Sequence, residues 1–429
     1  MKRFLLLSLL FSSFITCGNK KEAKTSSSSE RHLSSDVDFK YILSIAKVMN
    51  TIKNSYVKEE KSEKDLFEAA IKGMMSSLSD PYSYYVSRED LDSMCKEYIE
   101  GSFDGGIGVL MLKFTDSDSI IVVEVLQGSP AEKAGLKRGD KIVKIDNQTL
   151  EGKKSKDCVE IIKGKENTYV TLSIRKKDGS VTKSKLRRSK IEIDNVKGEM
   201  LEDNIGIIYL NKFSGKVAEK TRKIFSDLKK NGAAYIILDL RDNPGGTLEE
   251  AIAVSSIFTK KDPIVIQESK EEKKVFGSLG ESDESIPLVV LINNGSASGS
   301  EIVAACLKSH KRAILMGEKT YGKGSVQAVA PISSEDPDKG AIKLTIAKFL
   351  GPKDEIIDGK GVEPHICIGQ DSSAISAILD EEAKSLRHFE NFYIKMLESV
   401  DKQKKTQLQS AINIIKSVKG KFDIFFEGD

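Results

Sequence analysis

The second half of the chain alternates short apolar runs with amphipathic segments, and this alternation most constrains the fold. Beyond Asn204, runs typical of buried strands occupy residues 205–210, 235–240, 287–292 and 313–316. Segments with helical spacing fall between these runs, at residues 217–230, 248–258 and 301–309. Strands that are apolar throughout and separated by helices form parallel sheets covered on both faces. The sequence therefore predicts an α/β core here.

The first part of the chain follows two other patterns. Residues 38–77 carry apolar side chains at helical spacing until Ser79-Asp80-Pro81-Tyr82 interrupts them. Residues 101–188 predict a small α+β unit instead, because strand-like and helical stretches alternate with turns. Its expected strands are 120–125, 141–145 and 169–175, and its expected helices are 129–136 and 155–162.

The N-terminus predicts export to the periplasm or the cell envelope. Lys2 and Arg3 precede an apolar run over 4–15, which is too short to span a bilayer and typical of a signal peptide. Cys17 resembles the acylated cysteine of bacterial lipoproteins, although Phe14 and Thr16 depart from the usual residues before it. Both a lipid-anchored and an unanchored chain stay open.

The charge balance argues against nucleic acid as a partner. Lys and Arg total 67 against 64 acidic residues, for a formal net charge of +3, whereas phosphate binding needs a concentrated basic footprint. The one basic stretch, 175–190 with Asp178 as its only acid, is interpreted as a solvated hairpin face. A weaker alternative is attraction to anionic lipid headgroups.

The inventory of cysteine and histidine predicts no metal site and no cofactor. No cysteine after Cys17 belongs to a CxxC pair, and the histidines do not cluster along the sequence. A Ser-His-Asp triad is disfavoured for the same reason. The residues concerned are Cys95, Cys158, Cys306 and Cys367, and His32, His310, His365 and His388.

A peptide-binding motif lies in the α+β unit. The loop Gly105-Gly106-Ile107-Gly108 precedes Val109, and Ser129-Pro130-Ala131-Glu132-Lys133-Ala134-Gly135-Leu136 and Arg138-Gly139-Asp140 follow it. This combination resembles a PDZ domain. In such domains glycines let backbone N–H groups converge on a C-terminal carboxylate while the peptide adds a strand to the sheet. We expect Gly105, Gly106, Ile107, Gly108 and Val109 to bind an apolar C-terminus.

Two sharp turns follow buried strands in the core, at residues 239–246 and 293–301. Both also fit a purely structural role, because Thr247 with Glu250 and Ser298 with Glu301 match the capping box that opens a helix. However, Ser298 would lie at the carboxyl edge of the sheet, where α/β folds bind ligands. There the helix N-terminus favours a developing oxyanion.

A serine nucleophile needs a base, and Lys323 is the candidate. His310 lies farther along the helix after Ser298, on its expected solvent side. Lys323 stands between two glycines, which would admit its stem to an apolar pocket. Such a lysine acts as a base only when its surroundings favour the neutral form. Residues 317–323 nearly spell a phosphate-binding loop, but Gly324 replaces Ser or Thr and a strand follows, so nucleotide binding is rejected.

Over residues 80–364, motifs occur in an order that resembles carboxyl-terminal processing proteases of the Ser-Lys class, also called tail-specific proteases. These motifs are DPYS, the PDZ unit, LRDNPGG, NGSASGSE, GEKTYGKGSVQ and DGKGVEP. The resemblance implies a crotonase- or ClpP-like core with an inserted PDZ domain. It also implies Ser298 as nucleophile, Lys323 as general base and Gln327 as its orienting residue. Oxyanion donors would come from Gly299 and from Gly245 and Gly246.

These expectations combine into a multidomain α/β and α+β serine endopeptidase of envelope proteins that binds substrates by their C-terminal tails. The predicted segments are a signal peptide (1–16), a tether (17–36), an N-terminal helical region (37–100), the PDZ domain (101–188), the protease core (189–370) and a C-terminal helical region (371–429). The terminal helices could pack against a second copy of the chain, against an adaptor protein or against the rest of the same chain. A non-catalytic scaffold would not need the Ser, Lys and Gln set, and acyl-CoA chemistry would not need the PDZ domain or the export signal.

Overall fold

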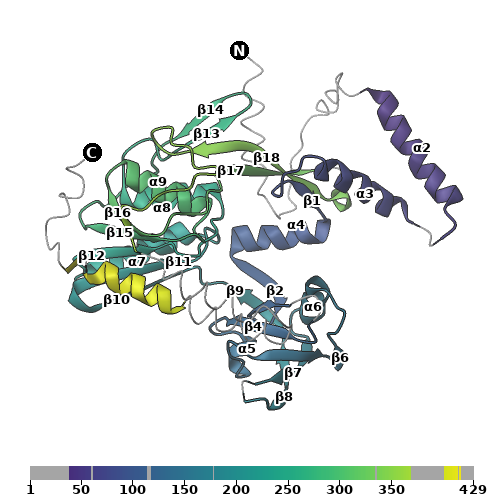
Figure 1. Cartoon of the computed structure of the whole chain (residues 1–429), viewed down its shortest axis with the longest axis horizontal. Helices are drawn as coiled ribbons and strands as arrows, with labels where there is room; N and C mark the ends of the chain where they lie inside the picture. Colours follow the sequence, from purple (N-terminus) through teal and green to yellow (C-terminus); the bar gives the residue numbers. More distant parts are fainter. Residues whose placement is uncertain are drawn as a thin grey trace, which may run out of the picture. The chain divides into compact units, whose positions relative to one another are not determined.

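The computed structural model describes residues 38–58, 61–113, 117–176, 178–333, 336–368, 401–413 and 415–416. The predicted signal peptide, the tether with Cys17, residues 369–370 of the predicted core, and residues 371–400, 414 and 417–429 of the predicted C-terminal region lie outside the described residues. The chain divides into two compact units (Figure 1). Residues 326–347 group with the residues up to Cys95, and all the others form the second unit.

The first unit contains helices and a small antiparallel sheet. The predicted helical stretch 38–77 is two helices, because the Ser62 hydroxyl accepts from Asp65 N at 3.1 Å and starts a new helix. Strand β1 pairs antiparallel with β18, which also pairs with β17. Its elements are α2 (Phe39–Ser55), α3 (Glu63–Ser76), β1 (Tyr84–Val86), α4 (Arg88–Cys95), β17 (Ser325–Pro331) and β18 (Ala341–Leu350), the last two crossing its boundary.

The α+β part of the second unit has the predicted strands and helices. Its main sheet has the order β3-β4-β5-β7-β8, with β3 at one edge. Ile120, Ile142 and Leu172 are buried with neighbouring apolar residues in one core. The elements are β2 (Ser102–Gly106), β3 (Val109–Leu112), β4 (Ile120–Val125), α5 (Pro130–Lys133), β5 (Lys141–Ile145), β6 (Gln148–Thr149), α6 (Ser155–Ile162), β7 (Tyr169–Arg175), β8 (Val181–Arg187) and β9 (Ser189–Glu192).

The core of the second unit is a six-stranded sheet of order β10-β11-β12-β15-β16-β19. The strands from β11 onward are parallel, as predicted, and β10 adds an antiparallel edge. The strands are β10 (Val196–Met200), β11 (Ile205–Leu210), β12 (Tyr235–Asp239), β15 (Leu288–Ile292), β16 (Ala313–Gly317) and β19 (Ile366–Cys367). The helices between them are α7 (Val217–Lys230), α8 (Leu248–Phe258) and α9 (Gly299–Ser309), and β13 (Val265–Ser269) and β14 (Lys273–Phe276) form a hairpin.

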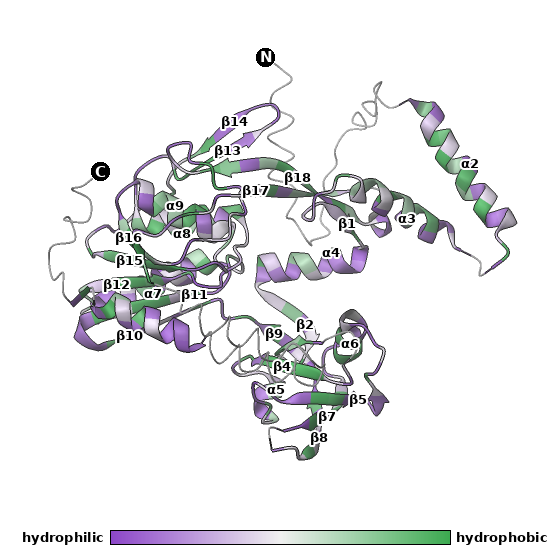
Figure 2. Ribbon diagram, in the orientation of Figure 1, coloured by the Kyte–Doolittle hydropathy of each residue, from purple (hydrophilic) through white to green (hydrophobic). Residues whose placement is uncertain are grey.

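Apolar residues of the central sheet are buried on both of its faces. Strands β15 and β16 are among its most hydrophobic segments (Figure 2). On one face, Ile237 and Leu291 pack with Ala411 and Ile415 of the helical residues 401–413 and 415–416, in yellow in Figure 1 and called the C-terminal helix below. None of the described helices is both long and apolar enough to cross a bilayer.

The expectation that α9 faces solvent is wrong. Every residue from Gly299 to Leu307 is buried, because α8 packs along α9 and adds a further layer. His310 ends the helix, and its Nε2 lies 2.8 Å from Pro263 O. This histidine is therefore part of the packing of α9.

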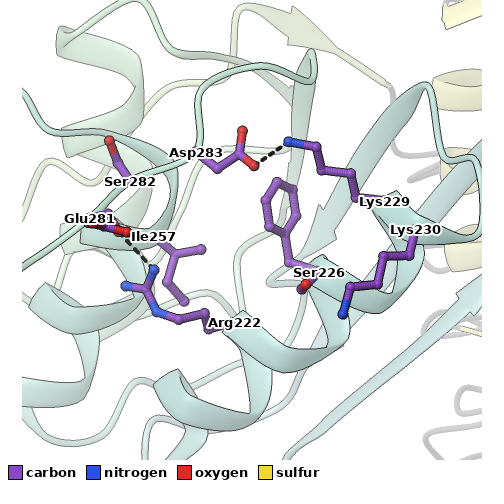
Figure 3. A pocket seen from close by; sticks show the side chains of 9 residues that line it. Arg222, Ser226, Lys229, Lys230, Ile257, Glu281, Ser282 and Asp283 are labelled. Atoms are coloured by element: carbon purple, nitrogen blue, oxygen red, sulfur yellow. Dashed lines mark hydrogen bonds and ion pairs between the residues drawn. The ribbon is translucent and has the colours of Figure 1, made fainter.

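A cavity of ≈ 650 Å³ lies between α7 and residues 281–283 (Figure 3). Three of its charged side chains bond to neighbouring groups: Lys229 Nζ lies 2.5 Å from Asp283 Oδ2, and Arg222 Nη1 donates to Glu281 O at 2.7 Å. Partial burial raises the pKa of the Asp283 carboxyl, but hydrogen bonds from Lys229 and Ser285 outweigh it and lower this pKa from 3.8 to about 2. These contacts hold the 281–285 loop on α7.

Asp283→Asn is expected to lower the free energy of unfolding at pH 7 by about 1 kcal/mol or less, because a partly exposed ion pair contributes little. The pKa of Asp283 is lower in the folded protein than in the unfolded chain. The ion pair therefore stabilises the fold fully above pH 3.8, and this stabilisation is lost as the pH falls through about 2. Urea unfolding at several pH values checks this, with Asp227→Asn, an exposed residue of α7, as the control. A deficit that stays constant down to pH 2 would contradict it.

Candidate active site

Ser298 occupies a strained turn between β15 and α9. It is the N-cap of α9, with φ 54° and ψ −113°, a conformation that residues other than glycine rarely adopt. Such strain persists only where the surroundings hold it, and it is common at functional sites. The half-buried serine thus stands at the carboxyl edge of the sheet, at the N-terminus of a buried helix.

The glycine turn after β12 lies directly against Ser298. A methyl group on Gly245 would be 2.7 Å from Ser298 Cβ and 2.6 Å from Gly299 N, and the φ of Gly245 is +94°. Only glycine allows this approach. Gly246 is equally confined, because its added methyl would lie 2.0 Å from Phe213 O. The two predicted turns therefore meet at the serine.

The backbone N–H groups of this region differ in their availability. Gly245 N donates to Asn243 Oδ1 at 2.9 Å. Within the described part of the chain, no acceptor bonds the N–H of Gly246 or of Gly299. Gly246 and Gly299 thus retain donors for a ligand, whereas Gly245 does not.

Asn243, whose place in the LRDNPGG motif gives no sign of its role, links the two turns. Its side chain is fully buried and donates to Leu210 O at 2.7 Å. Its backbone carbonyl oxygen accepts from Ala297 N at 3.0 Å and from Ser300 Oγ at 2.8 Å. The residues on either side of Ser298 are in this way fixed to the glycine turn.

Glu301 joins the serine turn to the loop of Lys323. Its Oε2 accepts from Ser298 N and from Lys323 N, both at 2.8 Å. Its Oε1 accepts from Gly322 N at 2.7 Å and from Thr320 Oγ1 at 2.6 Å. The sequence predicted the cap on Ser298, but gave no sign of the three bonds to residues 320–323.

Burial raises the pKa of the Glu301 carboxyl above its ordinary value, and its hydrogen bonds oppose this rise. All four bonds come from N–H or O–H donors, so both oxygens act as acceptors. The ionised form satisfies every donor at once. A buried carboxylate with this many donors fixes the geometry around it.

The loop that carries Lys323 is held on its other side by the DGKGVEP segment. Thr320 N donates to Val362 O at 3.1 Å, and Val362 N donates to Thr320 Oγ1 at 2.7 Å. Gly359 N donates to Gly322 O at 2.8 Å. Lys323 is half-buried, between two glycines that are buried. The glycines allow close packing of this loop, since a methyl group on Gly324 would lie 2.4 Å from Asp358 N.

Gln327 belongs to the first unit, and its contacts there involve the DPYS segment. Its Nε2 donates to Thr345 Oγ1 at 3.1 Å, and Thr345 N donates to Ser83 Oγ at 2.9 Å. Ser83 Oγ in turn donates to Asp80 Oδ2 at 2.5 Å. The amide of Gln327 is therefore anchored by a chain of hydrogen bonds.

The predicted peptide-binding residues lie together at one edge of the α+β unit. Gly105 and Gly108 have φ of +62° and +78°, and Ile107 is buried. Val109 begins β3, which pairs with β4 on one side and, among the described strands, with no other strand on its second side. Leu110 on this edge is largely exposed. A peptide could therefore extend the sheet at β3.

Metal-binding side chains do not gather in the described residues, where no group of three His, Cys, Asp or Glu is close enough to hold an ion. The four cysteines Cys95, Cys158, Cys306 and Cys367 are free thiols. Burial raises the pKa of the Cys306 thiol to about 12, which keeps it protonated and unreactive.

Three family models match the chain. Peptidase family S41 matches residues 204–368, a PDZ domain matches residues 121–176, and the N-terminal domain of the activating protease CtpB matches residues 10–90. The S41 match includes Ser298, Lys323 and Gln327. The PDZ match covers much of the α+β unit.

Two curated relatives extend over most of the chain. A probable CtpA-like serine protease of Staphylococcus haemolyticus is 35% identical over 395 residues, which are 87% of this chain and 77% of the relative. The carboxy-terminal processing protease CtpA of Bacillus subtilis is 37% identical over 322 residues, which are 75% of this chain and 67% of the relative. Among solved structures, a photosystem II D1 C-terminal processing protease has a similar fold, with a TM-score of 0.50 and 23% identity over 80% of this chain and 97% of that one.

Glu301→Gln is expected to lower kcat on the order of 10²-fold, because small misplacements of catalytic groups have effects of that size. An amide turns one acceptor oxygen into an NH₂ group that would face two N–H or O–H donors. Steady-state cleavage of a peptide checks this, with Glu249→Gln on α8 as the exposed control. A folded Glu301→Gln protein with unchanged kcat would contradict the role given to Glu301.

Proposed function

Because the chain belongs to peptidase family S41 and is a serine-type C-terminal processing peptidase with a PDZ domain, we propose that Ser298 and Lys323 form its catalytic dyad. Ser298 is the nucleophile and Lys323 is the general base. The observation that carries this proposal is the Glu301 carboxylate, which bonds the backbone N–H groups of both residues at 2.8 Å. One buried group thus fixes both backbones.

In the reaction, neutral Lys323 takes the proton of the Ser298 hydroxyl while Oγ attacks the scissile carbonyl. The resulting lysine ammonium then gives its proton to the leaving amine. A water activated by the same lysine hydrolyses the acyl-enzyme and restores Ser298. We also propose, from its place in the GEKTYGKGSVQ motif, that Gln327 orients the Lys323 side chain.

The oxyanion is stabilised by backbone N–H groups. We propose Gly299 and Gly246 as the donors, because their N–H groups have no acceptor in the described part of the chain and lie beside the serine turn. The earlier candidate Gly245 contributes through its close approach, since its own N–H is bonded to Asn243. The N-terminus of α9 adds a favourable field for the negative oxygen.

Ser298→Ala and Lys323→Ala are each expected to lower kcat by at least ~10³-fold, because loss of either member removes covalent catalysis. Both chains should keep their thermal midpoint, as neither change deletes a buried side chain. The measurement is cleavage of an internally quenched peptide that ends in a free carboxylate. Turnover like that of the unchanged protein in either variant would refute the assignment of Ser298 and Lys323 as the catalytic dyad.

The PDZ domain selects the substrate. We propose that the C-terminal carboxylate binds at Gly105-Gly106-Ile107-Gly108 and that the tail pairs with β3. The open edge of β3 and the exposed Leu110 support this mode and favour an apolar C-terminal side chain. Whether the bound tail activates or inhibits the protease is decided by how cleavage responds to a separate tail peptide.

A peptide that ends in a carboxylate is expected to bind at least ~10-fold more tightly than the same peptide ending in an amide, because charge-assisted hydrogen bonds are stronger than neutral ones. Fluorescence anisotropy with the full-length Ser298→Ala protein measures both affinities without cleavage. A peptide with free carboxylate but two terminal aspartates serves as the control for side-chain selection. Equal binding of the amide and the carboxylate would refute the binding mode.

Export completes the proposal. Residues 2–15 have the charge and length of a signal peptide, and Cys17 follows at a position suited to lipid attachment. We propose that the peptidase acts on envelope proteins, either tethered through Cys17 or released. A second copy of the chain or an adaptor is a further proposed partner, supported by exposed apolar residues on α2 such as Tyr41 and Leu43.

A further inference from the structure

A buried glutamine on the C-terminal helix connects two loops of the active site. Gln407 is 2% exposed, and it lies four and eight residues before the buried Ala411 and Ile415. It therefore belongs to the helix face that packs on the sheet. Burial of an amide in such a stripe is unfavourable unless hydrogen bonds satisfy both of its ends.

Both ends of the Gln407 amide have a partner. Its Oε1 accepts from Arg241 Nη1 at 3.2 Å, and its Nε2 donates to Glu318 Oε1 at 3.1 Å. A guanidinium can only donate and a carboxylate can only accept, so these neighbours determine the orientation of the amide. Gln407 is thus a specific bridge between two charged groups.

The two partners belong to the turns on either side of the nucleophile. Arg241 follows β12 and lies four residues before Gly245, whereas Glu318 follows β16 and lies five residues before Lys323. In the sheet order β12-β15-β16, the strand that precedes Ser298, β15, lies between the strands that precede Arg241 and Glu318. Neighbouring strands are spaced about 4.8 Å apart, so the bridge spans roughly 10 Å across the carboxyl edge.

Each partner keeps other bonds that do not involve Gln407. Arg241 binds both oxygens of Asp239, at 2.9 and 2.6 Å, and donates to Lys404 O at 2.5 Å. Glu318 also accepts from Gln403 Nε2 at 2.6 Å. Arg241 and Glu318 would therefore each keep a partner without the Gln407 amide. We expect the protein to fold when this amide is removed.

We propose that Gln407 is a positioning residue for the peptidase reaction. It keeps the oxyanion turn and the loop of the general base at a fixed separation on the two sides of Ser298. The C-terminal helix thereby becomes part of the catalytic framework, although none of its residues touches the reacting atoms. This inference rests on the proposed roles of Lys323 and of the glycine turn.

The test is Gln407→Met in the full-length protein, with Gln409→Met as the matched control. Methionine keeps the length and helix propensity of glutamine but loses both hydrogen bonds. Gln409 is exposed, and among the described residues its side chain bonds only to Asn413 of its own helix. We expect Gln407→Met to lower kcat by about 10- to 100-fold with KM within about twofold, since positioning affects the chemical step. Gln409→Met should leave both parameters unchanged.

A second variant, Gln407→Glu, keeps an acceptor for Arg241 and loses the donor to Glu318, so its kcat should fall as well. Unchanged kcat in both Gln407 variants would overturn the inference, and so would a loss of folding in both, which would assign the residue to stability. A rise in KM of about 10- to 100-fold without a fall in kcat would also overturn it. If the unchanged protein cleaves no peptide at all, the proposed function fails instead.

Discussion

The geometry of the active site depends on one buried carboxylate. Glu301 lies in the first turn of α9 and accepts four hydrogen bonds, from Ser298, Thr320, Gly322 and Lys323. A buried carboxylate is costly unless donors surround it, and here the donors belong to the two loops that must meet. The interaction that stabilises the charge is therefore also the one that holds the backbones of the proposed nucleophile, Ser298, and the proposed base, Lys323. This arrangement turns a common helix cap into a structural link.

The parallel sheet places Glu301 and its hydrogen-bond donors at the carboxyl edge of its strands. Three neighbouring strands, β12, β15 and β16, end at the glycine turn, at Ser298 and at the loop of Lys323. Asn243 joins the first turn to the second, Glu301 joins the second to the third, and Gln407 connects the first to the third. The three bridges form a closed network of buried polar groups, and such networks specify one arrangement when every member is satisfied.

Much of this fold follows from the pattern of apolar residues. Strand β11 and helix α7 have the predicted bounds because their periodicity is strong and their ends carry turn residues. The burial of α9 was not predictable, since it depends on a neighbouring helix that is distant in sequence. The hydrogen bond from Gly245 N–H to Asn243 Oδ1 could not be predicted either, because it follows from the local shape of the turn. Gln407 had a weak signal, as a polar residue in line with Ala411 and Ile415, but nothing in the sequence names its partners.

If Ser298 forms the covalent bond to substrate, a mechanism-based inhibitor must form its adduct on this residue. The full-length protein would be inactivated with a peptidyl phosphonate ester that carries an apolar C-terminal tail with a free carboxylate, and the adduct would be located by mass spectrometry of its proteolytic peptides. We expect one phosphonyl group per chain, on Ser298, with loss of cleavage in proportion to labelling. Full inactivation with the adduct on any other residue would contradict it.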